Sequence, residues 1–152
     1  MISKKILSNY DIGIVSKVEP ISAGLVHDTY AIKTDRGQYI IQKLHPVLAS
    51  QAVAKDFLAV TRFLKAQSFP TPECVLTKQE EVLVKDGAFR WRMQTRLSGK
   101  TVHTVKDRGM AREAGEIYAR FHKVLDPLKY KFKSNKILHE TEKEFEKFEK
   151  VI

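Results

Sequence analysis

Cysteine is nearly absent from this sequence, with Cys74 alone among 152 residues. A single cysteine excludes a disulfide within the chain and a zinc site built from cysteines, and it predicts a protein of the reducing cytoplasm. Long apolar runs are also missing, so the sequence predicts no membrane-spanning helix. The first ten residues lack the apolar stretch and the cleavage site of a secretory signal.

Acidic residues are few compared with basic ones: 27 Lys and Arg against 18 Asp and Glu give a net charge of +9. Such a surplus favours a polyanionic partner, for which nucleic acid is one candidate. The basic residues are spread along the chain, however, and no recognition-helix pattern, zinc-ligand spacing or aromatic RNA-binding motif accompanies them. A nucleotide or phosphate pocket is therefore the first interpretation, and a basic nucleic-acid-binding or interaction protein is the alternative.

The periodicity of apolar residues predicts an α+β fold. Strands are expected over 13–22, 26–34, 38–44, 81–85 and 88–97, with a helix over 48–65. Asp86-Gly87 predicts a tight hairpin between the last two strands. Helical patterns then follow over 107–125 and 139–152. The expected architecture is a mostly antiparallel sheet of about five strands with one packed helix, followed by a helical region.

Five short motifs in this order resemble the aminoglycoside phosphotransferase and choline kinase family, and most closely its N-acetylhexosamine kinase-like members. They are SAGLVHDTY (22–30), GQYIIQKLH (37–45), FPTPE (69–73), WRMQTRLSGKTV (91–102) and AGEIYARFHKVL (114–125). The resemblance implies a protein-kinase-like small lobe over 1–97. Over 98–152 it implies a hinge and the first helices of an incomplete large lobe. It further implies ATP as the nucleotide and, in a full-length relative, Mg²⁺ and a sugar or amino alcohol that presents a hydroxyl.

The resemblance also implies where the nucleotide binds. Small residues around Gly24 fit a loop whose backbone N–H groups approach the triphosphate, although one glycine also fits a plain hairpin turn. Residues 94–97 fit a hinge whose backbone pairs with adenine. The residues expected at the nucleotide are Ser22, Gly24, Leu25, Ile41, Lys43, Asp56, Gln94, Thr95, Arg96 and Leu97.

The cation for the phosphates is expected at Lys43. Strand alternation places Gln42 and Lys43 on opposite faces, and many relatives carry their basic residue at what looks like the Gln42 position, so which of the two faces the phosphates stays open. The helix that follows has no glutamate to pair with the cation, which leaves Asp56 as the only acid for this role. A solvated lysine and a solvated aspartate are the alternative interpretations.

Aspartate and asparagine are scarce near the end of the sequence. Phosphoryl transfer in the resembling family needs an aspartate to accept the hydroxyl proton, a later asparagine and a further acid for magnesium. No aspartate follows Asp126, and Asn135 is the only asparagine there. We expect no catalytic or metal-binding residue in these 152 residues, and hence a truncated relative that is inactive alone. Apolar positions such as Ile117 and Phe121 predict exposed apolar surface or self-association.

Overall fold

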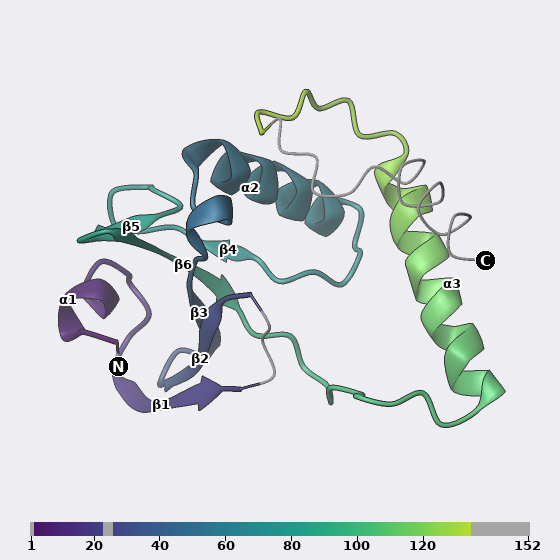
Figure 1. Cartoon of the computed structure of the whole chain (residues 1–152), viewed down its shortest axis with the longest axis horizontal. Coiled ribbons are helices and arrows are strands. Elements are labelled where there is room, and N and C mark those ends of the chain that lie inside the picture. The colour runs from purple at the N-terminus through teal and green to yellow at the C-terminus, as the bar shows by residue number, and fades with distance from the viewer. Residues whose placement is uncertain (1, 23–25, 135–152) are drawn as a thin grey trace, which may run out of the picture.

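The computed structural model describes residues 2–22 and 26–134 of the chain. A single antiparallel sheet forms the centre, and one long helix stands to the side of it (Figure 1). The elements in chain order are α1 (Lys4–Leu7), β1 (Val15–Ile21), β2 (Asp28–Thr34), β3 (Gln38–Lys43), a 3-10 helix (Pro46–Leu48), α2 (Gln51–Ala66), β4 (Cys74–Val75), β5 (Val84–Asp86), β6 (Phe89–Thr95) and α3 (Arg108–Leu125). The expected α+β fold class is confirmed.

The strands follow the order β1-β2-β3-β6-β4, and β5 pairs with β6. Every pair is antiparallel. In the β5–β6 hairpin Asp86 lies opposite Phe89, and Gly87 has a φ of 58°. Only glycine adopts this left-handed conformation without the steric cost of a Cβ atom. The hairpin predicted at Asp86-Gly87 is therefore confirmed.

Side chains along β3 and β6 alternate between the two faces of the sheet. One face, which we call the outer face, packs against α1 and the residues that follow it. Its core includes Ile41, Trp91 and Met93 from the sheet together with Ile6 and Tyr10. Ile41 and Met93 are 0% exposed. Full burial of such a side chain contributes about 1.5–3 kcal/mol, so this core contributes much of the stability of the sheet.

The opposite face, which we call the α2 face, packs against α2. This helix begins after Ser50, whose hydroxyl accepts a hydrogen bond from the backbone N–H of Val53 at 3.2 Å, as is typical of an N-cap. Phe57 of α2 lies over the sheet residue Arg92, with 3.7 Å between the guanidinium carbon and the ring centroid. The α2 face therefore combines apolar packing with polar side chains of the sheet.

The third helix, α3, confirms the helix predicted over 107–125. Asp107 caps it by accepting a hydrogen bond from the backbone N–H of Met110 at 2.8 Å. None of its residues is buried, and Ile117 is 58% exposed. Figure 1 shows the helix apart from the sheet, at the end of a long connection after β6. The helix predicted over 139–152 lies outside the described residues.

The sequence pattern does not predict two short elements, α1 and β4. The α1 helix has four residues, too few for an apolar repeat, and β4 has only two. Tertiary contacts form both: Ile6 of α1 is 1% exposed against the outer face, and Cys74 of β4 pairs with Gln94 of β6. The sheet therefore has six strands rather than about five. Across the described ranges, no helix has the length and apolar character needed to cross a membrane.

Candidate functional site

A cavity of about 330 Å³ lies where β6 runs into the connection toward α3. Its walls are Ile21 at the end of β1, Ile40 in β3 and residues 96–101. Ile40 lies two residues before Gln42, so both side chains project from the same face of the sheet. The cavity therefore opens on the α2 face, and its volume is in the range of small-ligand sites.

The backbone along one wall of this cavity has unused hydrogen-bonding groups. The N–H of Thr95 donates to the carbonyl of Glu73 at 2.8 Å, and the N–H of Arg96 donates to the carbonyl of Gln38 at 3.0 Å, so the sheet uses both. Over 97–101, no backbone hydrogen bond joins this segment to any other described residue. A flat heteroaromatic ring in the cavity can pair with this backbone without displacing an existing bond.

A partly buried cation, Arg92, lies farther along the same face. Arg92 donates from Nη2 to Oε1 of Gln42 at 2.9 Å, and its guanidinium stacks on the Phe57 ring. Burial lowers the pKa of Arg92, an effect that Cys74 and Tyr10 partly offset, but a guanidinium stays charged at neutral pH. The buried Nε has no hydrogen-bond partner, and no aspartate or glutamate of the described chain forms an ion pair with Arg92. A partly buried charge without a counterion is unfavourable, so this site is suited to an anionic group.

Lys43 lies on the outer face instead. Its ammonium pairs with the carboxylate of Asp28 at 3.2 Å, directly across the β2–β3 ladder. The same ammonium lies 3.9 Å from the ring centroid of Phe89. The structure therefore differs from the expected pairing of Lys43 with Asp56. Strand alternation directs the side chain of Gln42, and not that of Lys43, toward α2.

Asp56 has a different set of partners. Its carboxylate accepts hydrogen bonds from the Tyr130 hydroxyl at 3.0 Å and from the backbone N–H groups of Lys133 and Ser134 at 2.7 and 2.8 Å. Burial favours a raised pKa, but the hydrogen bonds from Ser134, Lys133 and Tyr130 outweigh it and lower the pKa of Asp56 to about 2. Asp56 therefore anchors the segment 130–134 on α2 and is not the partner of a sheet cation.

The other expected site residues fall into three groups. Arg96 and Leu97 line the cavity. Ile41 requires a correction, since its side chain is fully buried in the outer-face core and offers no surface to a ligand. Of the remaining residues, Ser22 is exposed after β1 and Gln94 lies on the α2 face. The hydroxyl of Thr95 accepts a hydrogen bond from the backbone N–H of Glu73 at 2.8 Å. Gly24 and Leu25 lie outside the described residues.

The expected set lacked Ile21, Ile40, Arg92 and the cavity residues 98–101. A signal for Arg92 exists, because alternation along 88–97 places it opposite in direction to Trp91 and Met93, and hence away from the apolar core. No comparable signal marks Ile21 and Ile40, which look like ordinary strand residues. For metal binding, no three His, Cys, Asp or Glu side chains gather within 2–22 and 26–134.

Comparison with known proteins agrees with this geometry. A model of the phosphotransferase enzyme family (APH) matches residues 17–148. Amicoumacin kinase hAmiN, solved with AMP-PNP, Ca²⁺ and Ami, has a TM-score of 0.71 and 16% identity, over 94% of this chain and 46% of that one. Spectinomycin phosphotransferase APH(9)-Ia, solved with ADP and spectinomycin, has a TM-score of 0.55 and 12% identity, over 86% and 41%. A search of curated proteins finds no significant match. The chain thus spans less than half of either solved structure, and these likenesses show the kinase-like fold.

Proposed function

Because the chain belongs to the phosphotransferase enzyme family, we propose that it forms the nucleotide-binding part of an ATP-dependent kinase of small molecules. The observation that carries this proposal is the cavity between Ile21, Ile40 and 96–101, with its unpaired backbone. Both similar structures were solved with an adenine nucleotide. Residues 1–97 then form the small lobe, and 98–152 form the connection and the start of the large lobe.

The shape of the site suggests how ATP lies in it. The adenine ring fits between Ile21 and Ile40, and its polar edge pairs with the backbone of 97–101. The phosphates then extend along β3 toward Gln42. The sequence Ser-Ala-Gly after β1 is small enough for backbone N–H groups to approach phosphate oxygens.

Arg92 is the residue that we assign to the phosphates. Its charge has no counterion among the described residues, and its Nη2 is already held in place by Gln42. An arriving phosphate supplies the anion that the partly buried guanidinium lacks. Lys43, engaged with Asp28 on the outer face, is assigned a structural role instead.

For the whole protein we propose phosphoryl transfer to a hydroxyl of a sugar, an amino alcohol or a similar small molecule, with Mg²⁺, in the cytoplasm. Such transfer needs a carboxylate that accepts the hydroxyl proton and acids that hold the metal. No described residue is assigned to the metal, since the described ranges hold no cluster of potential metal ligands, and none is proposed as the proton acceptor. Nucleotide binding without turnover is accordingly the property proposed for the 152 residues themselves.

Calorimetric titration with ATP and with adenosine tests the proposal. We expect weak ATP binding, with a dissociation constant of roughly 1 mM, or about −4 kcal/mol. Ile40→Trp fills the cavity and should abolish the binding of both ligands. Arg92→Met should weaken ATP binding roughly tenfold and leave adenosine binding unchanged. Lys43→Met is the matched control, a cation removed from the other face, and should change neither affinity.

Two results would overturn the proposal. One is the absence of any binding of ATP or adenosine to the folded chain. The other is binding that Ile40→Trp does not affect, that RNA matches in strength, and that falls steeply with added salt. That second pattern would assign the binding to the surface charge of +9 and favour the nucleic-acid alternative.

A further inference from the structure

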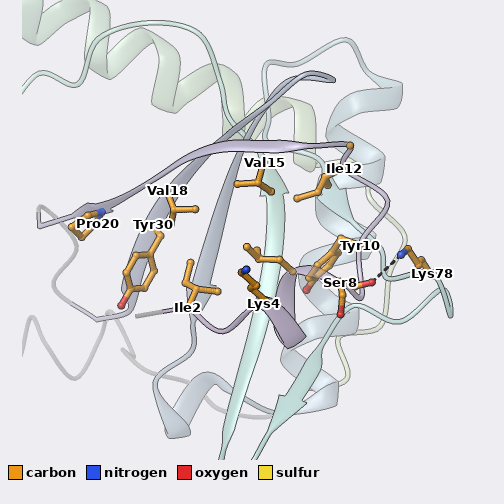
Figure 2. Close-up of a pocket in the computed structure, with 12 residues that line it drawn as sticks. Ile2, Lys4, Ser8, Tyr10, Ile12, Val15, Val18, Pro20, Tyr30 and Lys78 are labelled. Carbon is orange, nitrogen blue, oxygen red and sulfur yellow. Dashed lines mark hydrogen bonds between the residues drawn. The ribbon is translucent and has the colours of Figure 1, made fainter.

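The two faces of the sheet offer different surroundings to a phosphate. The outer face is hollowed between α1, β1 and β2 by a cavity of about 1000 Å³, whose lining is mostly apolar. Figure 2 shows Val15 and Val18 along this cavity and Lys78 at one end, where its ammonium donates to the Ser8 carbonyl at 2.9 Å. The α2 face instead holds Arg92, whose charge no described acid neutralises. A residue that assists Arg92 in binding phosphate must therefore lie on the α2 face.

His27 lies directly before β2, beside the end of β3. The β2–β3 ladder pairs Asp28 with Lys43, so His27 lies across from Leu44, which packs against residues of α2. Neighbouring residues of a strand point to opposite faces of the sheet. Val26 and Asp28, on either side of His27, line a small hollow of the outer face together with Lys43. The His27 side chain accordingly lies on the α2 face.

The position of His27 fits the far end of an extended nucleotide. From Ile40 in the nucleotide cavity, the α2 face runs past Gln42 to Leu44, and these four residues of strand span about 13 Å. Adenosine and three phosphates in an extended conformation have a comparable length. Arg92 pairs with Gln42 across the β3–β6 ladder, so it lies midway along this path. His27 lies where the path ends.

One nitrogen of the His27 ring already has a partner within the fold. The backbone N–H of His45 donates to Nδ1 of His27 at 3.1 Å. A ring nitrogen that accepts a hydrogen bond carries no proton, so the proton of the neutral ring is on Nε2. Nε2 of this half-buried residue bonds to no other described residue, and it is not among the side-chain nitrogens that the described fold buries without a partner. Nε2 is therefore an oriented donor that a ligand can reach.

The surroundings keep this ring neutral. Burial lowers the pKa of His27, and the positive charge of Arg92 and the neighbouring His45 lower it further, while a hydrogen bond with the Val26 carbonyl acts in the opposite direction. An unperturbed histidine is already mostly neutral at pH 7. His27 therefore keeps its Nδ1 acceptor and its Nε2 proton at that pH. The effect of Arg92 also agrees with the placement of both residues on one face.

We propose that His27 binds the terminal phosphate of the nucleotide by donating a hydrogen bond from Nε2 to a phosphate oxygen. This inference rests on the proposed nucleotide site and adds a residue at its far end. Arg92 contributes charge at the middle of the path, and His27 contributes a neutral donor whose direction the His45 N–H fixes. A nucleotide with a single phosphate is too short to reach His27. The site should therefore prefer ATP to AMP.

Nitrogen NMR of the imidazole rings tests this assignment without any measurement of activity. In the free 152-residue chain at pH 7, Nδ1 of His27 should resonate as an unprotonated nitrogen and Nε2 as a protonated one. Added ATP should shift the Nε2 signal of His27, and added AMP should shift it much less. His122, which is exposed on α3, provides the control ring and should respond to neither nucleotide.

Two substitutions separate the roles of the two ring nitrogens. In His27→Asn the amide oxygen takes the place of Nδ1 and still accepts from the His45 N–H, but nothing replaces Nε2. ATP should then bind roughly tenfold more weakly, with AMP and adenosine binding unchanged. In His27→Gln the longer side chain brings an amide donor to the Nε2 position, so ATP affinity should return close to that of the wild type. His122→Gln is the matched control and should change no affinity.

The outcomes distinguish a failure of this inference from a failure of the nucleotide site. A wild-type chain that binds neither ATP nor adenosine would overturn both. With ATP binding intact, an unchanged affinity in His27→Asn or a protonated Nδ1 in the free chain would overturn the role of His27 alone. Equal losses of ATP and adenosine in His27→Asn would show that this residue only supports the fold. A His27→Gln variant as weak as His27→Asn would exclude donation from the Nε2 position.

Discussion

The two faces of the sheet arise from the same strands but have opposite chemistry. Over 41–42 of β3 and 91–94 of β6, successive residues alternate between a buried apolar side chain on the outer face and a polar one on the α2 face. The apolar set is Ile41, Trp91 and Met93, and the polar set is Gln42, Arg92 and Gln94. A rigid apolar layer thereby fixes the positions of polar groups one residue away. This is how a small sheet can present a precise ligand site.

Each face also contains buried polar atoms that have no hydrogen bond within the described residues. On the outer face these are the hydroxyl of Tyr10 and Nε1 of Trp91, and on the α2 face it is Nε of Arg92. Such groups reduce stability. The only one of the three that belongs to a charged group lies on the α2 face, to which the nucleotide is assigned.

The largest effect should follow from damage to the apolar layer. Met93→Ala removes a side chain that is 0% exposed at the centre of the outer-face core. We expect the free energy of unfolding to fall by about 2–5 kcal/mol, because transfer and cavity terms add. Urea denaturation followed by Trp91 fluorescence measures this loss.

The matched control is Gln94→Ala, the next residue of β6, whose side chain lies on the α2 face. Its effect should be less than about 1 kcal/mol, because no buried apolar contact is lost. Comparable losses in Met93→Ala and Gln94→Ala would contradict the division of labour between the two faces.

Much of this arrangement could be predicted from the sequence. The order of the longer strands and helices followed from apolar periodicity, although α1 and β4 did not, and the hairpin followed from Asp86-Gly87. The alternation along 88–97 also separated Arg92 from Trp91 and Met93. What alternation cannot decide is which face the next helix covers. That single choice determines whether Gln42 or Lys43 faces α2, and it depends on long-range packing.

Contacts between segments that are far apart in the chain could not be predicted from the sequence. The partners of Asp56 are Tyr130, Lys133 and Ser134, which lie 74 to 78 residues later in the chain. Two of these three partners are backbone N–H groups, which any residue type provides. The same limit applies to the cavity beside 96–101, because its apolar walls come from three separated segments that resemble ordinary strand or loop residues.

The second largest effect is expected at the buried carboxylate of Asp56. Asp56→Asn replaces one acceptor oxygen by an amide donor, so one of the backbone N–H groups of Lys133 and Ser134 loses its acceptor. The segment 130–134 should then detach from α2 more often. We expect amide exchange at Lys133 and Ser134 to become roughly tenfold faster. Exchange in β3 should not change, and Lys55→Ala, an exposed neighbour, should have no effect at 130–134.

The same contact should respond to acid. The pKa of Asp56 is lowered from 3.8 to about 2 in the folded state, so the ionised carboxylate stabilises the fold. This contribution is complete above the unfolded pKa near 3.8 and is lost as the pH falls toward 2. Protection of the Ser134 amide should fall over this interval in the wild type and stay constant in Asp56→Asn. An identical pH profile in both proteins would exclude Asp56 as the anchor.

A smaller effect, with the opposite sign, is expected at Arg92. Arg92→Met keeps an apolar stem over Phe57 and removes a partly buried cation that no described acid neutralises. We expect the free energy of unfolding to rise by about 1 kcal/mol. A gain in stability together with a loss of ATP affinity would identify Arg92 as a binding residue. A loss above about 1 kcal/mol would instead show that its stacking and its bond to Gln42 are structural.

The smallest effect should arise on the outer face at Lys43. Its pair with Asp28 is partly open to solvent, since the two side chains are 27% and 62% exposed. Exposed ion pairs contribute only about 0.2–1 kcal/mol, so Lys43→Met should lower the free energy of unfolding by no more than this. A double-mutant cycle with Asp28→Asn isolates the pair, and its coupling energy should shrink further in 1 M salt because charges in water are screened. A coupling that salt leaves unchanged, or an effect well above 1 kcal/mol, would mean that the outer face depends on charge at this edge as well as on its apolar core.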